Sequence, residues 1–566
     1  MRDRRILMSF SVRCMDCGHL TAYHPNEINC PQCNSQWREA IYDYTEIAKA
    51  LPGVLAGRSF DLWRYQELLP IARVQPALRM GEGGTPLIRA TNIGTMLGCN
   101  NIFIKDERQG PSASFKDRQA AVTIAALKEA GITEMVAAST GNVAIAYSAY
   151  AARAGIKLWA FVTSLVPAVK MREIALYGSQ VVKVTGSYDQ VKKIAADFAS
   201  QRGLYLDMGA RTITSVEGMK TIAYEIAEQL TLEFGRDRLA PAQGPGWRTP
   251  DWYVQAISGG LGPIGVTKGF LEMRQMGFIG ASGTIPAIAC IQADGCAPMV
   301  HAWKQNLDDA SPVVNPKTHI ETLATGTPGR AYKILRKKML EANGLFESVT
   351  DEEAFRAMHV LAKMEGISAE PASAAAFAGL FKLAHAGIIK PDDVVVVNCT
   401  GHTMPAEPLV LGSSWARNVV LPSQEESPQE EGLLAALSRI APDRFPRIAI
   451  VDDTADARRL IRRILQSQGE YTLFEASNGR EGLELIQREH PDLLILDLMM
   501  PEMDGFAVLD ALKADPETAQ IPVIVSTAKE LTPGEKGRLQ GQIHALMQKG
   551  DFMSDEFLEE VKSLIR

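Results

Sequence analysis

The sequence lacks the features that mark secreted and membrane proteins. Its 566 residues include eight cysteines, too few for a scaffold held together by disulfides. The most apolar stretches, such as residues 144–152 and 394–397, are far shorter than the about 20 apolar residues that span a bilayer. The basic amino terminus has no long apolar segment and no small-residue cleavage site, so we predict no secretory signal. We expect a cytoplasmic protein.

An excess of positive charge is also absent. Lysine and arginine total 59 against 66 for aspartate and glutamate, which gives a net charge of −7. Nucleic acids and anionic membranes are bound through basic surfaces, so neither is expected as a partner. Hydrophobic residues (46%) and charged residues (22%) occur at the levels of a globular protein. At roughly 150 residues per domain, the length predicts about three or four domains.

The chain divides into four segments by composition. Residues 1–45 contain four clustered cysteines, and residues 46–410 alternate short apolar runs with helical patterns. Residues 411–445 include the acidic stretch SQEESPQEEG, which predicts a linker. Residues 446–566 begin with a clear strand pattern and alternate in the same way. This alternation predicts an α/β fold with parallel sheets on both sides of the linker.

The clustered cysteines form two CxxC pairs, Cys14 with Cys17 and Cys30 with Cys33, separated by about a dozen residues. Four thiolates at this spacing can surround one zinc ion and leave no open position, so the site would be structural. Zinc would also supply folding energy to a segment too small for a core of its own. Two redox dithiols, or a ribbon that has lost its metal, are the alternatives.

A lysine in an unusual position is the sharpest feature of residues 46–410. Lys116, within Ser114-Phe-Lys-Asp-Arg118, precedes a helical pattern at residues 119–130. A cation is unfavourable at a helix start, because the helix dipole prefers anions there. A buried lysine that forms an imine with an aldehyde removes that objection. Taken alone, the motif favours a surface lysine beside Asp117.

Glycines and polar side chains follow three predicted strands at their carboxyl ends, where ligands of open α/β sheets bind. Residues 134–139 lead into Ser139-Thr-Gly-Asn142, residues 252–257 into Ser258-Gly-Gly-Leu-Gly262, and residues 393–398 into Cys399-Thr400. Glycines between a strand and a helix let main-chain amides approach a phosphate. Helix capping by Asn142 and ordinary strand-end turns are the structural alternatives.

The second of these loops also matches a dinucleotide-binding pattern, Gly260-x-Gly-x-x-Gly265. The acidic residue after the next predicted strand, Asp294, lies further away than the usual distance of about 20 residues. A nicotinamide cofactor is therefore the weaker interpretation. A different phosphate-bearing cofactor fits the same loop without Asp294.

Seven motifs resemble, in this order, those of threonine synthase and more broadly those of fold-type II pyridoxal-phosphate enzymes. They are Gly81-Glu-Gly-Gly-Thr-Pro-Leu87, SFKDR (114–118), STGN (139–142), Glu217-Gly-Met-Lys-Thr221, SGGLG (258–262), Glu370-Pro-Ala-Ser-Ala374 and Thr400-Gly-His402. The resemblance covers about residues 10–410 of the chain, and the family includes members with an N-terminal zinc ribbon. It implies a two-lobed core like that of the tryptophan synthase β subunit, a homodimer and an amino-acid substrate.

The resemblance implies a role for each matching residue. Lys116 would form the internal aldimine and then shuttle protons, Asn142 would contact the ring hydroxyl, and Thr400 would hydrogen-bond the pyridine nitrogen. A hydroxyl at that nitrogen leaves it largely unprotonated, which suits eliminations and replacements. The remaining contacts would join the cofactor phosphate to Gly259, Gly260, Leu261 and Gly262, and the substrate carboxylate to Ser139 and Thr140.

Two departures from the family pattern leave the substrate open. Ser215 stands where threonine synthases carry an arginine that helps to hold the substrate phosphate, and Arg211 is displaced from that place. Residues 258–263 replace a loop that commonly contains asparagine. If the substrate is O-phosphohomoserine, the products are threonine and phosphate. The alternative is a dehydratase or β-replacement enzyme that acts on serine, threonine or an activated derivative.

Residues 446–566 carry chemistry of another kind. Asp452 with Asp453, Asp497, Thr527 and Lys549 each follow a predicted strand, so parallel strands would gather them at one sheet edge. Three carboxylates together favour a hard divalent cation such as Mg²⁺. The lysine and the hydroxyl would steady a phosphoryl group on one carboxylate. Acidic residues at exposed strand ends are the alternative.

This segment resembles a response-regulator receiver domain, with a flavodoxin-like (βα)5 fold. The resemblance implies Asp497 as phosphoacceptor, Asp452 and Asp453 as further Mg²⁺ ligands, and Thr527 with Lys549 as the switch pair. It also implies a sensor histidine kinase or phosphotransfer protein as partner. Leu546 stands where the family often has an aromatic residue, and Gly550 where it usually has proline.

The two resemblances leave one interpretation of another class. In it, the first domain binds pyridoxal phosphate or an amino acid without turnover. Phosphorylation of the receiver then changes a binding partner rather than a reaction rate.

Overall fold

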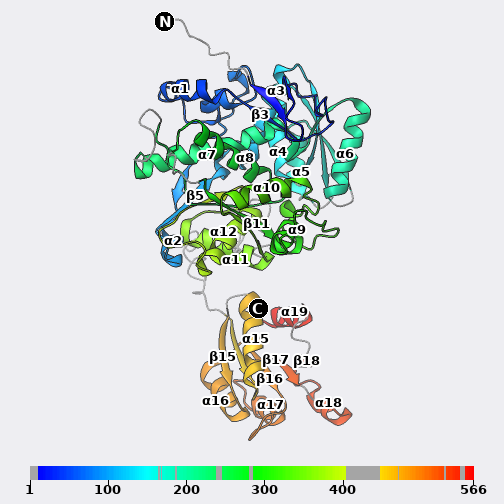
Figure 1. Ribbon diagram of the computed structural model, residues 1–566. Coiled ribbons are helices and arrows are strands. Elements are labelled where there is room, and N and C mark those ends of the chain that lie inside the picture. Colours follow the sequence, from blue (N-terminus) through cyan, green and yellow to red (C-terminus); the bar gives the residue numbers. More distant parts are fainter. Residues whose placement is uncertain are drawn as a thin grey trace, which may run out of the picture. The chain divides into compact units, whose positions relative to one another are not determined.

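The computed structural model describes residues 10–139, 141–163, 166, 168–184, 188–236, 245–279, 285–402, 446–468, 471–527, 531–548 and 555–565. The chain separates into two compact units, Met1–Ala416 and Arg417–Arg566 (Figure 1). The predicted linker at residues 411–445 lies outside the described residues. No helix in the described part of the chain is long and apolar enough to cross a membrane.

Helices make up most of the connections between strands. In the first unit they are α1 (Tyr44–Leu55), α2 (Thr91–Leu97), α3 (Lys116–Glu129), α4 (Asn142–Ala154), α5 (Ala168–Leu176), α6 (Tyr188–Arg202), α7 (Ile213–Phe234), α8 (Leu261–Gln275), α9 (Pro298–Lys304), α10 (Arg330–Glu341), α11 (Asp351–Glu365) and α12 (Pro371–His385). The 3-10 turns are η1 (Leu62–Leu68), η2 (Pro76–Leu78), η3 (Glu107–Gln109), η4 (Gly209–Arg211), η5 (Asp294–Cys296) and η6 (Glu321–Leu323). The α-helices of the second unit are α15 (Ala455–Gln468), α16 (Gly479–Glu489), α17 (Gly505–Ala514), α18 (Pro533–Leu539) and α19 (Asp555–Leu564).

The largest sheet has the strand order β12 (Leu345–Val349), β11 (Ala287–Ala293), β10 (Trp252–Ala256), β13 (Val394–Cys399), β5 (Asn101–Asp106) and β4 (Leu87–Arg89). All pairs are parallel except β4 with β5. Tyr253 and Val396 pack with α7, α8 and α10, whereas the alternate residues Val254 and Val397 pack with α11 and α12. Burial on both faces explains why the central strands are mostly apolar.

A second parallel sheet has the order β8 (Gln180–Val184), β7 (Lys157–Thr163), β6 (Glu134–Ser139) and β9 (Tyr205–Asp207). Met135 and Ala137 of β6 pack with α3 and α4, while Val136 packs with α6 on the opposite face. Helix α3 also packs against α7, which belongs to the core of the large sheet. This helix therefore joins the two sheets.

The amino-terminal segment forms a small antiparallel sheet in the order β2 (Leu20–Thr21), β1 (Ser11–Cys14) and β3 (Arg38–Ile41). Val12 and Ala40 are fully buried in the core that contains α7 and α8. The segment is therefore anchored to the first unit by apolar packing in addition to any metal it binds.

The second unit is a five-stranded parallel sheet in the order β15 (Thr472–Ala476), β14 (Arg447–Val451), β16 (Leu493–Asp497), β17 (Val523–Thr527) and β18 (Ala545–Gln548). Ile448 and Ile450 of β14 pack with α15 and α19, and Ala449 and Val451 pack with α16 and α17. The predicted α/β fold is confirmed in both units.

Two local details differ from the expectation. Helix α3 begins at Lys116, three residues before the predicted helix, so the lysine lies in the helix itself. Asn142 does not cap α4 with its side chain. Gly141, with a φ of +139°, takes the cap position, and Asn142 is the first helical residue.

Candidate active site and receiver site

Strand ends of the six-stranded and the four-stranded sheet border one cavity of about 530 Å³. Its wall includes the ends of β6 and β10 and the first residues of α3, α4, α8 and α10. Helix starts present unpaired N–H groups and the positive end of the helix dipole, so this wall suits anions. The sequence-predicted residues that line the cavity are Lys116, Asn142, Gly259, Gly260, Leu261, Gly262 and Thr400.

Main-chain hydrogen bonds join the segment before α3 to the end of β13. The amide of Phe115 donates to the carbonyl of Thr400 at 3.0 Å, and the amide of His402 donates to the carbonyl of Ala113 at 3.1 Å. These two bonds connect the segment that leads into Lys116 with the segment that contains Thr400.

The amine of Lys116 is easier to deprotonate than that of an ordinary lysine. The residue is half-buried and lines the cavity. Burial lowers the pKa of Lys116 to about 8, although Glu370 and Asp207 act in the opposite direction. About a tenth of such an amine is neutral at pH 7, against less than about a thousandth for an unperturbed lysine. The neutral, nucleophilic form is therefore accessible near neutral pH.

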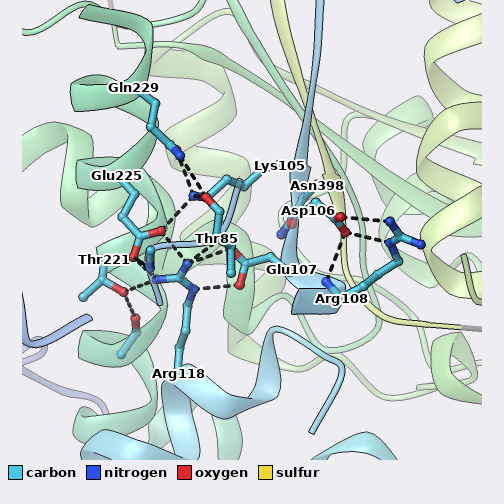
Figure 2. A network of polar contacts seen from close by, with 12 residues as sticks. Thr85, Lys105, Asp106, Glu107, Arg108, Arg118, Thr221, Glu225, Gln229 and Asn398 are labelled. Carbon is cyan, nitrogen blue, oxygen red and sulfur yellow. Dashed lines mark hydrogen bonds and ion pairs between the residues drawn. The ribbon is translucent and has the colours of Figure 1, made fainter. Parts of the chain in front are cut away.

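Figure 2 shows a buried ionic network that begins in the first turn of α3. Arg118 is 1% exposed, and its guanidinium donates two hydrogen bonds each to the carboxylates of Glu107 and Glu225, at 2.6–2.8 Å. Lys105 of β5 donates to Glu225 at 2.8 Å and to the carbonyl of Thr85 at 2.6 Å. Although burial raises it, Arg118 and Lys105 lower the pKa of Glu225 to about 2. Two cations thus face two carboxylates.

Glu370, at the start of α12, connects two of the cavity residues. The Asn142 Nδ2 donates to the Glu370 carboxylate at 2.8 Å, and the Lys170 Nζ donates to the Asn142 Oδ1 at 2.7 Å. The Thr400 hydroxyl lies 2.8 Å from the Ser373 hydroxyl and donates to Glu370 at 3.3 Å. Sequence reasoning quoted Glu370 within a motif but assigned it no function, because these contacts join residues far apart in the chain.

The glycine loop leads the main chain into α8 at the cavity wall. Gly260 has a φ of +82°, and a Cβ there would come within 2.6 Å of Leu335 Cδ1. A Cβ on Gly262 would come within 2.3 Å of the Gln255 amide. A Cβ on Gly259 would meet no protein atom and would enter open space. Gly260 and Gly262 thus permit close packing of the loop, and the missing side chain of Gly259 lets a ligand phosphate approach the main chain there.

An orphaned acceptor in the cavity wall also favours a bound group. Gln119, one turn after Lys116, lines the cavity, and among the described residues its Oε1 is buried without a hydrogen-bond partner. An unsatisfied buried polar atom costs about 1–3 kcal/mol. With the amine, the helix starts and the Thr400 hydroxyl, this donor and acceptor set fits a phosphorylated aldehyde such as pyridoxal phosphate.

The structure gives no support for a substrate contact by Ser139 or Thr140, the two residues expected at the substrate carboxylate. The Ser139 hydroxyl accepts from the amides of Gly141 at 2.9 Å and Ala144 at 3.0 Å. It therefore shapes the turn into α4 and is not among the described residues that line the cavity. Thr140 lies outside the described residues.

The position of the displaced arginine could not be read from the sequence. Ser215 is fully buried and donates at 3.0 Å to Asp207, which lines the cavity, whereas Ser215 itself does not. Arg211, which precedes it by four residues, does line the cavity, together with Arg330 and Lys192. Three cations that sequence reasoning did not place are thus present in the wall.

The four cysteines of the amino-terminal segment lie together. Their Sγ atoms are within 4.8 Å of one another, with 3.5 Å between Cys14 and Cys33 and 3.6 Å between Cys17 and Cys30. Four sulfur atoms at this spacing can surround one tetrahedral metal ion.

In the second unit, three carboxylates gather at the carboxyl ends of β14 and β16. Oxygens of Asp452, Asp453 and Asp497 lie within 4.8 Å of one another; Asp452 and Asp497 are buried and Asp453 is exposed. Thr527, the last residue of β17, is also buried. Lys549 lies outside the described residues. Carboxylate oxygens at this spacing can bind one divalent cation.

Comparisons with known proteins identify the family of each unit. Residues 78–401 match the pyridoxal-phosphate dependent enzyme family, and residues 448–561 match the response regulator receiver domain. Threonine synthase of Methanocaldococcus jannaschii is 35% identical over 394 residues, which are 69% of this chain and 91% of that protein. Threonine synthase of Methanosarcina acetivorans is 33% identical over 402 residues, 70% of this chain and 92% of that protein. The chain therefore belongs to the pyridoxal-phosphate dependent enzymes, as a lyase of the threonine synthase type that also carries a receiver domain.

The buried network around Arg118 generates a stability prediction. Arg118→Met removes the cation between Glu107 and Glu225 and should lower the free energy of unfolding by about 3–5 kcal/mol. The matched control Arg356→Met removes an exposed i,i+4 pair with Glu352 and should cost less than about 1 kcal/mol. Urea unfolding followed by tryptophan fluorescence reports the first unit, because all seven tryptophans precede residue 416. Equal losses in the two variants would contradict the prediction.

Proposed function

We propose that this protein converts O-phosphohomoserine and water into threonine and phosphate, with pyridoxal phosphate as its cofactor. The observation that carries the proposal is Lys116, whose amine has a pKa of about 8 and lines the same cavity as the glycine loop and Thr400. A reactive amine, an anion-binding helix start and a hydroxyl are the groups through which a protein holds and orients this cofactor.

Each cavity residue has a distinct function in this proposal. Bound pyridoxal phosphate supplies an aldehyde that condenses with amines and a ring that delocalises charge from the substrate α-carbon. The amides of residues 259–262, at the start of α8, hold the cofactor phosphate. Asn142 and Thr400 orient the ring and are themselves fixed by Glu370. Lys116 attaches the cofactor, takes the α-proton when neutral and later returns a proton.

The cations in the cavity wall favour a phosphorylated substrate. Elimination removes a proton from the β-carbon and breaks the γ-carbon–oxygen bond, whose electron pair leaves with the phosphate. The hydroxyl of water then adds at the β-carbon, and the γ-carbon takes up a proton. Ser215 cannot bind the leaving phosphate, but Arg211 and Arg330 line the cavity, and guanidinium groups bind phosphate through paired N–H donors. Free serine or threonine carries no phosphate for these guanidinium groups to bind.

The receiver and the cysteine cluster complete the proposal. Asp497 accepts a phosphoryl group from a histidine kinase or phosphotransfer protein, and Asp452, Asp453 and Asp497 hold Mg²⁺. The close approach of their carboxylates supports this, because a divalent cation relieves the repulsion among them. Thr527 and Lys549 are the proposed switch pair. The four cysteines hold one structural zinc ion.

Product analysis tests the proposed reaction. The holoenzyme should release phosphate and threonine in equal amounts from O-phosphohomoserine and almost no ketoacid from serine or threonine. Lys116→Ala should lose the visible absorbance of the bound cofactor and at least about a thousandfold in turnover. Lys363→Ala, exposed on α11, is the control and should behave as wild type. Ketoacid from threonine without phosphate release from O-phosphohomoserine would instead identify a dehydratase.

Phosphate labelling tests the receiver. With Mg²⁺ and acetyl phosphate, the wild-type chain should be labelled and Asp497→Asn should not, because the acceptor carboxylate is gone. Asp510→Asn, an exposed residue paired with Arg538, should keep the label. Chelation of Mg²⁺ should abolish labelling in every variant. Asp497→Asn should retain cofactor absorbance and basal turnover, and a label that persists in it would show that another residue is the acceptor.

A further inference from the structure

The amino-terminal cysteine segment, residues 10–41, reaches the cavity described above. Trp37, which precedes β3, is one of the residues that line the cavity. The carbonyl of Trp37 accepts from the amide of Met15, which lies between Cys14 and Cys17. The cavity wall is thus connected by a main-chain hydrogen bond to the first pair of cysteines.

One cavity arginine pairs with a residue that lies between the same two cysteines. Asp16, also between Cys14 and Cys17, forms an ion pair of 2.5 Å with Nη1 of Arg330. The Arg330 guanidinium lies 5.7 Å from the centre of the Trp37 ring. Arg330 is the first residue of α10 and lines the cavity.

The other cavity arginine is bound by the residue next to Trp37. The Nη1 of Arg211 donates to Oε1 of Gln36 at 2.6 Å. Among the described residues, this is the hydrogen bond that fixes the Arg211 guanidinium, and its other N–H donors are not used by protein groups. A guanidinium has five N–H donors, so each arginine can be held by one nitrogen and bind an anion with the others.

We propose that the cysteine segment positions Arg211 and Arg330 as the pair that binds the leaving phosphate of the substrate. Asp16 and Gln36 are the positioning residues, and the two arginines take the place of the family arginine that Ser215 replaces. The proposal rests on the proposed function for the identity of the substrate. The metal site is then coupled to substrate binding, because the residues that hold the arginines lie within or close to the cysteine pairs.

Binding of inorganic phosphate to the holoenzyme tests this without turnover. The cofactor phosphate already occupies the glycine loop there, so titration calorimetry reports the second anion site. Arg211→Gln and Arg330→Gln should each weaken phosphate binding at least about tenfold. Asp16→Asn and Gln36→Leu should each weaken it about three- to tenfold, because the guanidinium loses its anchor. The KM for O-phosphohomoserine should rise by the same factors while kcat and cofactor absorbance stay unchanged.

Arg13→Gln is the matched control. Arg13 belongs to the same segment and pairs with Glu39 at the surface, but it is not among the cavity residues, so phosphate binding should be unchanged.

Zinc content, measured in every variant, separates loss of the anchor from loss of the segment's fold. If Asp16→Asn loses zinc, Gln36→Leu decides the question. Wild-type phosphate affinity in Gln36→Leu, or in both arginine variants, would overturn the proposal. If the variants weaken phosphate binding as expected but the wild-type enzyme forms no threonine, the anion site is supported and the proposed reaction is rejected.

Discussion

A guanidinium buried between two carboxylates is the constraint on which the catalytic site depends. Arg118 lies two residues after Lys116, in the first turn of α3, and it binds Glu107 after β5 and Glu225 on α7. Any shift of that turn would separate charges in a region from which water is excluded. Loss of one partner of a buried pair costs about 3–5 kcal/mol, several times the net contribution of a main-chain hydrogen bond. The network therefore fixes the first turn of α3 and, with it, the position of Lys116 at the cavity.

The contact between α3 and α7 shows why the surrounding motifs contain the residues they do. Gly218 on α7 is so close to α3 that a Cβ would come within 2.4 Å of the Arg118 carbonyl oxygen. Only glycine permits this approach. The same helix then supplies Glu225 to the network. The motifs SFKDR and EGMKT thus meet as two sides of one packed contact, one of which carries the reactive amine.

The strand ends could be predicted from local sequence and the role proposed for Lys116 from the order of the family motifs, whereas the partners of the site residues could not. Glycines and hydroxyls after apolar runs identified the glycine loop and Thr400, because strand polarity fixes where such residues gather. Glu370, Arg211 and Arg330 were not placed, because their positions in the site depend on contacts between distant segments, such as Asp16 with Arg330. Tertiary contacts of this kind leave no periodicity or spacing in one sequence.

The central claim is that the Lys116 amine carries the cofactor, and reductive trapping tests it most directly. Borohydride fixes a pyridoxyl group onto the lysine to which the cofactor is bound, and peptide mass spectrometry then identifies that residue. The account predicts the added mass on the peptide that contains Lys116, at close to one group per chain. Added mass on another lysine, with the Lys116 peptide unmodified, would contradict it.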